Sequence, residues 1–142
     1  MDKEKLKYSE ELEGLYEICP PENYQSKNIT AFRWVYDDIN DDENFKPLAK
    51  RNPQRLLSLE DKMKCKSYSL SMFNSKDTAV KRFEFFKRKL KKKANKLGTN
   101  IAEGNILEEH GVNSEIEGNG HFSHFMHNNS NYASIFNIID KL

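Results

Sequence analysis

The sequence predicts an α+β protein. We expect a small, mainly antiparallel sheet of about 4-5 strands, one long basic amphipathic helix packed on one face, and a short N-terminal helix. Two observations predict this class. Several short segments alternate apolar with polar residues, which is typical of half-buried strands. Residues 75–97 instead place apolar residues at three- and four-residue spacing, which is typical of a helix packed on a core.

The length and the aromatic content predict one domain. A chain of 142 residues is long enough to bury a core without disulfides or metals. Its nine Phe, six Tyr and one Trp supply much of the volume of that core. We therefore expect residues 1–142 to form a single domain, with an N-terminal helix and loop at residues 1–29 on its periphery.

The first third of the chain predicts a helix followed by a strand. Residues 3–18 place leucines and a tyrosine at helical spacing, and Pro20-Pro21 ends this helix. Residues 30–36 alternate aromatic residues with others and are rich in types that favour strands. We expect the acidic segment after this strand to be a solvated loop.

The middle of the chain predicts a strand that leads directly into the long helix. Serines alternate with apolar residues from Ser67 to Phe73, which predicts a strand with one small polar face. Ser75 is a favourable N-cap. From there the apolar stripe runs to Leu97, and Gly98 is expected to end the helix.

The last third predicts three more strands. Residues 99–107 and 121–127 both alternate apolar with polar residues, and residues 132–139 suit a buried final strand. The intervening residues 108–120 contain three glycines and four acids, so we expect a loop there.

Charge is distributed in blocks. The chain carries a net charge of only +1, but residues 1–61 are net −5, residues 62–97 are net +11 and residues 98–142 are net −5. Blocks of this kind predict either an interaction surface or internal pairing between acidic and basic segments.

The basic helix is the main candidate interaction surface. Phosphate backbones and acidic proteins both bind to surfaces of this kind. A solvated helix face and neutralisation by the acidic segments are the two alternatives without a partner. The residues that we expect to bind an anionic partner are Lys81, Arg82, Lys87, Arg88, Lys89, Lys92 and Lys93.

The two cysteines and the N-terminal sequence predict the cellular location of the protein. Cys19 and Cys65 have no metal-ligand spacing, and a chain of this size does not need a disulfide, so we expect two reduced thiols. The N-terminus lacks an apolar signal segment, and no apolar run is long enough to span a bilayer. These features predict a cytoplasmic protein without membrane association.

Neither the acidic loop nor the histidines predict a metal site. Asp38, Asn40 and Asp42 open like a calcium loop, but Glu43 replaces the required Gly and Ala49 replaces the required Glu. The histidines at positions 121, 124 and 127 lie on a predicted strand, which cannot bring all three to one point. We therefore expect no metal.

A scattered set of polar residues suggests an enzyme. Arg33, Ser69 with its neighbour Ser71, and Glu103 lie on successive predicted strands. This order resembles the arginine–serine–glutamate layout of ADP-ribosyltransferases. The resemblance implies NAD, positioned by Arg33 and the serine strand, with Glu103 orienting the attacking group. His124 completes the candidate catalytic set.

The sequence therefore leaves three functions open. The first is a small binding or regulatory domain that acts through protein–protein interaction, with the basic helix as its surface. The alternatives are an NAD-using enzyme of the ADP-ribosyltransferase type and a non-specific nucleic-acid binder. We expect no cofactor outside the enzyme alternative. A structure that gathers the candidate residues in one pocket would favour the enzyme.

Overall fold

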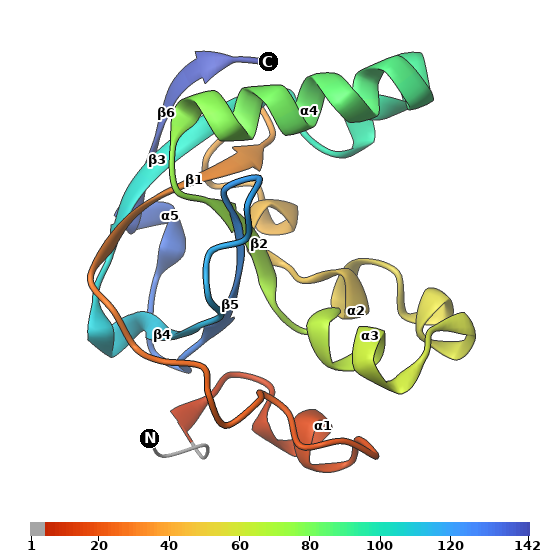
Figure 1. The fold of residues 1–142 in the computed structure, drawn as a ribbon. Helices are drawn as coiled ribbons and strands as arrows, with labels where there is room; N and C mark the ends of the chain where they lie inside the picture. Colours follow the sequence, from red (N-terminus) through yellow and green to blue (C-terminus); the bar gives the residue numbers. More distant parts are fainter. Residues whose placement is uncertain (1–4) are drawn as a thin grey trace.

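Six strands form one open antiparallel sheet in the order β4-β5-β2-β1-β3-β6 (Figure 1). This is the architecture of the computed structural model, which describes residues 5–142. The α+β class is confirmed, but the predicted number of strands was too low. The strands are β1 (Ile29–Val35), β2 (Leu70–Phe73), β3 (Asn100–Ile106), β4 (Gly111–Asn113), β5 (His121–Met126) and β6 (Phe136–Lys141).

Most of the helices are short. The α-helices are α1 (Ser9–Glu13), α2 (Leu48–Arg51), α3 (Asp61–Lys66), α4 (Lys76–Leu90) and α5 (Tyr132–Ile135). Short 3-10 helices cover Asp42–Phe45, Pro53–Ser58, Lys91–Lys96 and Glu108–His110. The helix predicted over residues 3–18 is reduced to α1, and its first two residues lie outside the described part of the chain.

The strand that the sequence did not reveal is β4, which lies in the segment predicted as a loop. Three residues are too few to show an alternating pattern. Gly111 lets this strand pair with β5, because a Cβ at that position would lie 2.0 Å from the carbonyl oxygen of Phe125. The predicted final strand is also divided, since α5 precedes β6.

The long helix α4 covers one face of the sheet, as predicted. The Ser75 side chain accepts a hydrogen bond from the Thr78 amide and caps its first turn. Ala79 and Phe83 are buried, and Ala79 packs with Phe32 of β1. The prediction of one helix over residues 75–97 was wrong in part. Lys91 adopts a φ of 53°, which ends the α-helix, and 3-10 turns continue to Lys96.

The opposite face of the sheet holds the largest core cluster. Leu70 and Met72 of β2 pack there with Phe122 of β5, and Phe136 of β6 closes the cluster near β3. The segment around Phe45, together with α5, covers this face. Consecutive residues of a strand alternate between the two faces, so the cross-strand register assigns every strand residue to one of them.

The pairing between β1 and β2 is short, and this positions the candidate site. The two strands meet only at the Phe32–Phe73 pair. The strand predicted from Ser67 begins at Leu70, because Ser67 and Ser69 donate hydrogen bonds to backbone carbonyls three residues earlier, at Lys64 and Lys66. Such bonds hold the chain in turns and compete with strand pairing.

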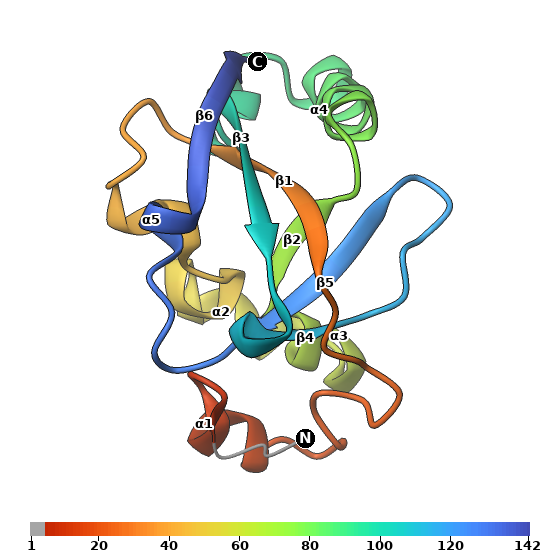
Figure 2. The ribbon, with the colours of Figure 1, turned by 90° about the vertical axis from the view of Figure 1, so that its left-hand side faces the viewer.

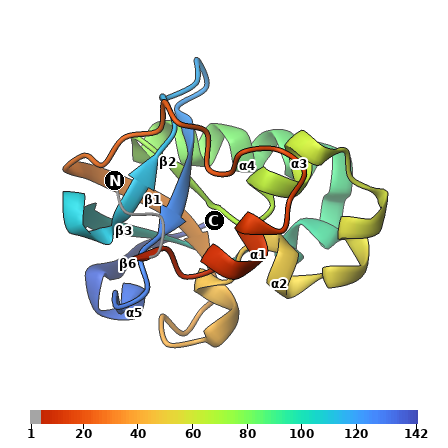
Figure 3. The ribbon, with the colours of Figure 1, turned by 90° about the horizontal axis from the view of Figure 1, so that it is seen from below.

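The N-terminal segment packs against the body of the protein. Leu6, Leu12 and Cys19 are buried, and the Lys50 ammonium in α2 lies 2.5 Å from the Glu11 carboxylate in α1. Figure 3 shows α1 next to α2. Figure 2 shows α1 at the end of the molecule remote from α4. Residues 1–29 are therefore tied to the core over most of their described length.

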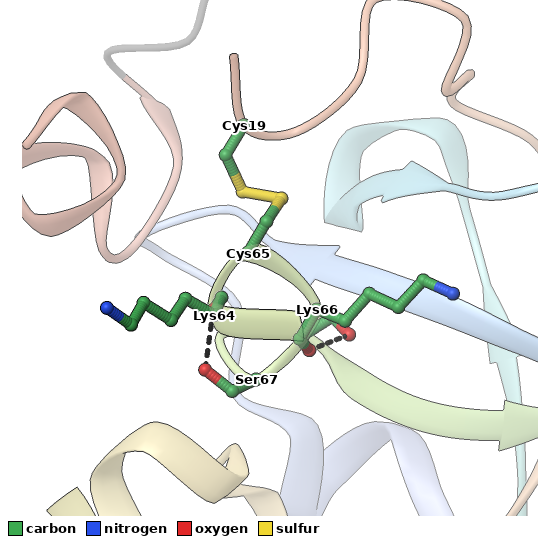
Figure 4. The surroundings of a disulfide bond; sticks show 6 residues. Cys19, Lys64, Cys65, Lys66 and Ser67 are labelled. Carbon is green, nitrogen blue, oxygen red and sulfur yellow. Dashed lines mark hydrogen bonds between the residues drawn. A yellow bond between two sulfur atoms is a disulfide. The ribbon is translucent and has the colours of Figure 1, made fainter. Parts of the chain in front are cut away.

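A disulfide joins Cys19 to Cys65 of α3, and the prediction of two reduced thiols was wrong (Figure 4). The two cysteines are 46 positions apart, and only the fold brings them together. Because disulfides are rare in reducing compartments, this bond removes one ground for the predicted cytoplasmic location. No helix in residues 5–142 is long and apolar enough to cross a membrane.

Candidate functional site

A cavity of about 500 Å³ opens where β1 and β2 separate. Arg82 and Phe86 of α4 line one side, and Arg51 of α2 and Met63 of α3 line the other. Figure 1 shows α4 beyond one end of β2 and α2 and α3 near its other end. The volume falls within the range of about 300–1,000 Å³ that is usual for ligand sites. We call this cavity the basic cleft.

Arg33 is the most deeply buried cation of the basic cleft. It belongs to β1, and only 8% of the residue is exposed to solvent. The guanidinium donates from Nε to the Asn44 carbonyl at 2.8 Å and from Nη1 to the Ser71 carbonyl at 2.7 Å. The second bond gives the Ser71 carbonyl of β2 a hydrogen-bond donor at a point where β1 no longer pairs with β2.

The positive charge of Arg33 is not neutralised within residues 5–142. No carboxylate in that part of the chain lies within ion-pair distance, and Nη2 makes no hydrogen bond there. Burial, together with the nearby charge of Arg51, lowers the pKa of Arg33 to about 9. A buried cation without a carboxylate partner is the arrangement expected of an anion-binding group.

Cations outnumber acids around the cavity. Its cations are Arg33, Lys46, Arg51, Arg55, Lys66 and Arg82, and its only acid is Glu117. Among the described residues, Glu43 serves both Lys46 at 3.1 Å and Arg51 at 3.6 Å, while Glu117 pairs with His121. Four cations, including Arg33 and Arg82, are left without an acidic partner in residues 5–142.

An apolar wall faces these charges. Leu48 and Met63 line the cavity and are 40% and 46% exposed, so both offer apolar surface to a ligand. Trp34 also lines it, with its indole N–H donated to the Ala79 carbonyl and its ring packed edge-on against Phe83 and Phe86. The basic cleft therefore combines positive charge with a rigid apolar surface.

Two serine hydroxyls add neutral donors. Ser71 of β2 and Ser123 of β5 are paired across the strands and share the face of the sheet opposite to that of Arg33, and they line the cavity from that face. Neither hydroxyl makes a hydrogen bond within residues 5–142. The hydroxyls of Ser67 and Ser69, which also line the cavity, are already donated to backbone carbonyls.

The predicted catalytic residues do not form one site. Arg33 pairs with Ala102, whereas Glu103 pairs with Phe32, so Arg33 and Glu103 lie on opposite faces of the sheet. Arg33 and Ser69 line the basic cleft, but Glu103 and His124 do not. The arginine–serine–glutamate order is therefore not assembled as the resemblance to ADP-ribosyltransferases implies.

His124 is a buried structural residue. Its Nε2 lies 2.6 Å from the Tyr132 hydroxyl, which also bonds to the His110 carbonyl. Its Nδ1 lies 2.5 Å from Oδ1 of Asn113. Burial lowers the pKa of His124 to about 3, which keeps the ring neutral over the physiological range.

The basic helix, by which we mean α4 with the 3-10 turns to Lys96, faces solvent along its charged side. Of the seven predicted anion-binding residues, six are exposed, and Arg82 is half-buried against the rings of Phe85 and Phe86. Within residues 5–142, only Lys81 of these seven forms an ion pair, with Asp77 on the same helix. Among the described residues of the acidic blocks, only Asp140 pairs with this helix, at Lys76, so most of its charge is not neutralised by those blocks.

The acidic loop and the histidines serve local structure. Asp38 accepts a hydrogen bond from the Asn40 amide, and Asp41 caps the following 3-10 turn through the Glu43 amide. Within residues 5–142, no three His, Cys, Asp or Glu side chains are grouped so that they could hold a metal ion.

Sequence reasoning found only part of the basic cleft. Arg33 and Arg82 were predicted for two different sites, and Arg51 and Arg55 were not predicted at all. These last two lie on short helices without a motif, and only folding brings them to Arg33. The one available signal was an arginine within an otherwise aromatic, buried strand.

Comparisons with known protein families, with curated proteins and with solved structures found no match to this chain.

Proposed function

We propose that this chain is a binding domain for an acidic segment of a partner protein. In this proposal, the basic cleft takes one anionic group of that segment and the basic helix attracts the rest. The observation that carries the proposal is Arg33. It is a buried guanidinium, held rigidly by two backbone carbonyls, that meets no carboxylate in residues 5–142.

The basic helix supports the same function. Apart from Lys76, which pairs with Asp140, its exposed cations have no partner among the described residues of the acidic blocks, so they create a positive field next to the basic cleft. Such a field speeds the encounter with an acidic partner and aligns it. Arg82 connects the two surfaces, because it belongs to the helix and lines the cavity.

The lining of the cavity favours a protein partner over a nucleic acid. Single-stranded nucleic acids bind where aromatic rings are free to stack with bases. Trp34 is not free in this way, because Phe83 and Phe86 pack against its ring and its N–H is already bonded. The exposed apolar side chains, Leu48 and Met63, are aliphatic and suit side-chain contacts.

The test is charge reversal on the basic helix, with a fluorescently labelled glutamate-rich peptide as the probe. The variant replaces Lys89, Lys92 and Lys93 together with Glu. We expect the peptide to bind the wild type and to lose at least tenfold in affinity for the variant, measured by fluorescence anisotropy. All three side chains are exposed, so the fold should be unaffected.

The matched control carries the same change of charge away from the helix, at the exposed residues Lys5, Lys27 and Lys62. It should retain most of the affinity of the wild type. Equal losses in both variants would show that only net charge matters and would contradict the proposal. Tighter binding of an oligonucleotide of equal charge would instead favour a nucleic-acid partner.

A further inference from the structure

We infer that the group taken by the basic cleft is a phosphate monoester carried on a flat apolar body. A phosphorylated tyrosine side chain and a nucleoside monophosphate share this chemistry. The inference rests on the proposed function, since it names the ligand class of the same cavity. Four features of the lining carry it: the unpaired charge, the fixed orientation of Arg33, the two serine hydroxyls and the apolar wall.

The unpaired charge calls for more than one negative charge. After Glu43 and Glu117 are assigned to their partners, Arg33, Arg55, Lys66 and Arg82 are left without an acid within residues 5–142. A carboxylate supplies one negative charge, whereas a phosphate monoester carries about −1.5 to −2 at pH 7. Only Arg33 of these four is buried, whereas Arg82 is half-buried and Arg55 and Lys66 are exposed, so the dianion offsets the buried charge of Arg33 and still attracts the other three.

Arg33 is oriented before any ligand arrives. Its bonds from Nε to Asn44 and from Nη1 to Ser71 fix the guanidinium plane. The Nη2 edge has no partner within residues 5–142, and the residue lines the cavity. A planar guanidinium with a fixed free edge suits phosphate oxygens, and little conformational entropy is lost when it binds.

The hydroxyls of Ser71 and Ser123 also suit a phosphate monoester better than a carboxylate. A phosphate monoester has three terminal oxygens that accept hydrogen bonds, and a carboxylate has two. Ser71 and Ser123 lie side by side on β2 and β5 and have undonated hydroxyls within the described chain. They provide neutral donors for oxygens that the cations do not reach.

The apolar wall defines the other half of the ligand. Leu48, Met63 and Trp34 line the same cavity as Arg33, and the volume of about 500 Å³ exceeds what a phosphate group alone would fill. Inorganic phosphate would leave this wall exposed to water. A phosphate attached to a ring can occupy both halves at once.

The experiment uses Trp34 as its own reporter, because it is the only tryptophan of the chain and lines the cavity. The full chain is titrated with phenyl phosphate, benzoate and phenol, and tryptophan fluorescence is recorded. We expect phenyl phosphate to bind at least tenfold more tightly than benzoate, and phenol to bind most weakly. Inorganic phosphate should bind more weakly than phenyl phosphate.

A pair of variants on one helix tests the location. Arg82→Gln removes a cation that lines the cavity, and Arg88→Gln removes an exposed cation of the same helix that does not. Phenyl phosphate affinity should fall about tenfold or more in Arg82→Gln and less than twofold in Arg88→Gln. Arg33→Lys should weaken binding further, and its circular dichroism spectrum shows whether it folds.

The outcomes distinguish failure of the phosphate inference from failure of the proposed function. Equal affinities for phenyl phosphate and benzoate, both lost in Arg82→Gln, would overturn the phosphate inference and leave the proposed anion-binding function in place. The inference would be overturned if neither anion changed the fluorescence, or if phenyl phosphate affinity fell equally in Arg82→Gln and Arg88→Gln. If the glutamate-rich peptide also failed to bind, the proposed function would be overturned too. If phenyl phosphate binds as expected, titration with a phosphotyrosine peptide and with a nucleoside monophosphate identifies the source of the group.

Discussion

Removing the Cys19–Cys65 disulfide should destabilise the protein by several kcal/mol. The bond closes a loop over 46 positions of the chain. For a loop of this length, the chain-entropy relation gives about 4 kcal/mol at 25 °C, because the oxidised unfolded chain has fewer conformations. For a domain of this size, a loss of that order corresponds to a fall in Tm on the order of 10 °C.

The disulfide also holds two parts of one buried cluster together. Cys19 and Cys65 pack there with Leu12, Tyr68 and Phe125. Since α3 continues directly into Ser67 and Ser69, this bond ties the N-terminal segment to the wall of the basic cleft. Part of the loss should therefore appear as weaker ligand binding.

Urea unfolding, followed by the fluorescence of Trp34, measures the effect. The oxidised wild type is compared with the double variant Cys19→Ala, Cys65→Ala, and each is measured with and without a reducing agent. Reduction should lower the free energy of unfolding of the wild type and leave the double variant unchanged. A wild type and a double variant that agree within about 1 kcal/mol would refute the reasoning.

Two further predictions concern stability. Because burial lowers the pKa of His124 to about 3, its contribution is complete above its unfolded pKa of about 6.5 and is lost as the pH falls toward 3, by up to about 1.4 kcal/mol per pH unit. The slope of unfolding free energy against pH between about 6 and 4 should therefore be smaller in His124→Gln than in the wild type; equal slopes in the two proteins would contradict this. Gly104→Ala should cost about 1–3 kcal/mol, since its Cβ would lie 2.8 Å from Cγ of Phe136, whereas Gly118→Ala, with no atom within 4 Å of its Cβ, should stay within about 0.5 kcal/mol. Thermal unfolding of the two alanine variants checks the second prediction, and a Gly104→Ala protein as stable as the wild type would contradict it.

Local pattern was most informative where the chain has long periodic elements. The strand at residues 29–35, the capped helix from Lys76 and the alternating β5 follow from side-chain spacing, because one face of each is buried. The serine segment misled the prediction at Ser67 and Ser69. Their hydroxyls bond to nearby carbonyls, and such bonds leave the same alternation in the sequence as a strand does.

The candidate site was less accessible from sequence. Arg33 stood out as a polar residue in a buried strand, and Arg82 stood out as part of the basic helix. Arg51 and Met63 lie on short helices without sequence motifs, so the sequence does not indicate that they lie beside Arg33 and Arg82. Glu103 was predicted to belong to the same site as Arg33, and this was wrong. The pairing register, which is not visible in the sequence, places it on the other face of the sheet from Arg33.

By itself, the sequence determined the α+β class, the amphipathic helix on one face of a sheet, and the concentration of positive charge on that helix. These follow from side-chain periodicity and composition, which are local properties. Only the tertiary structure decided that Cys19 meets Cys65, that the described acidic blocks pair with the basic helix only at Lys76, and that β1 and β2 separate around Arg33. The physical reason is that pairing register, loop closure and burial depend on contacts between residues far apart in the chain, and the spacing of neighbours does not encode those contacts.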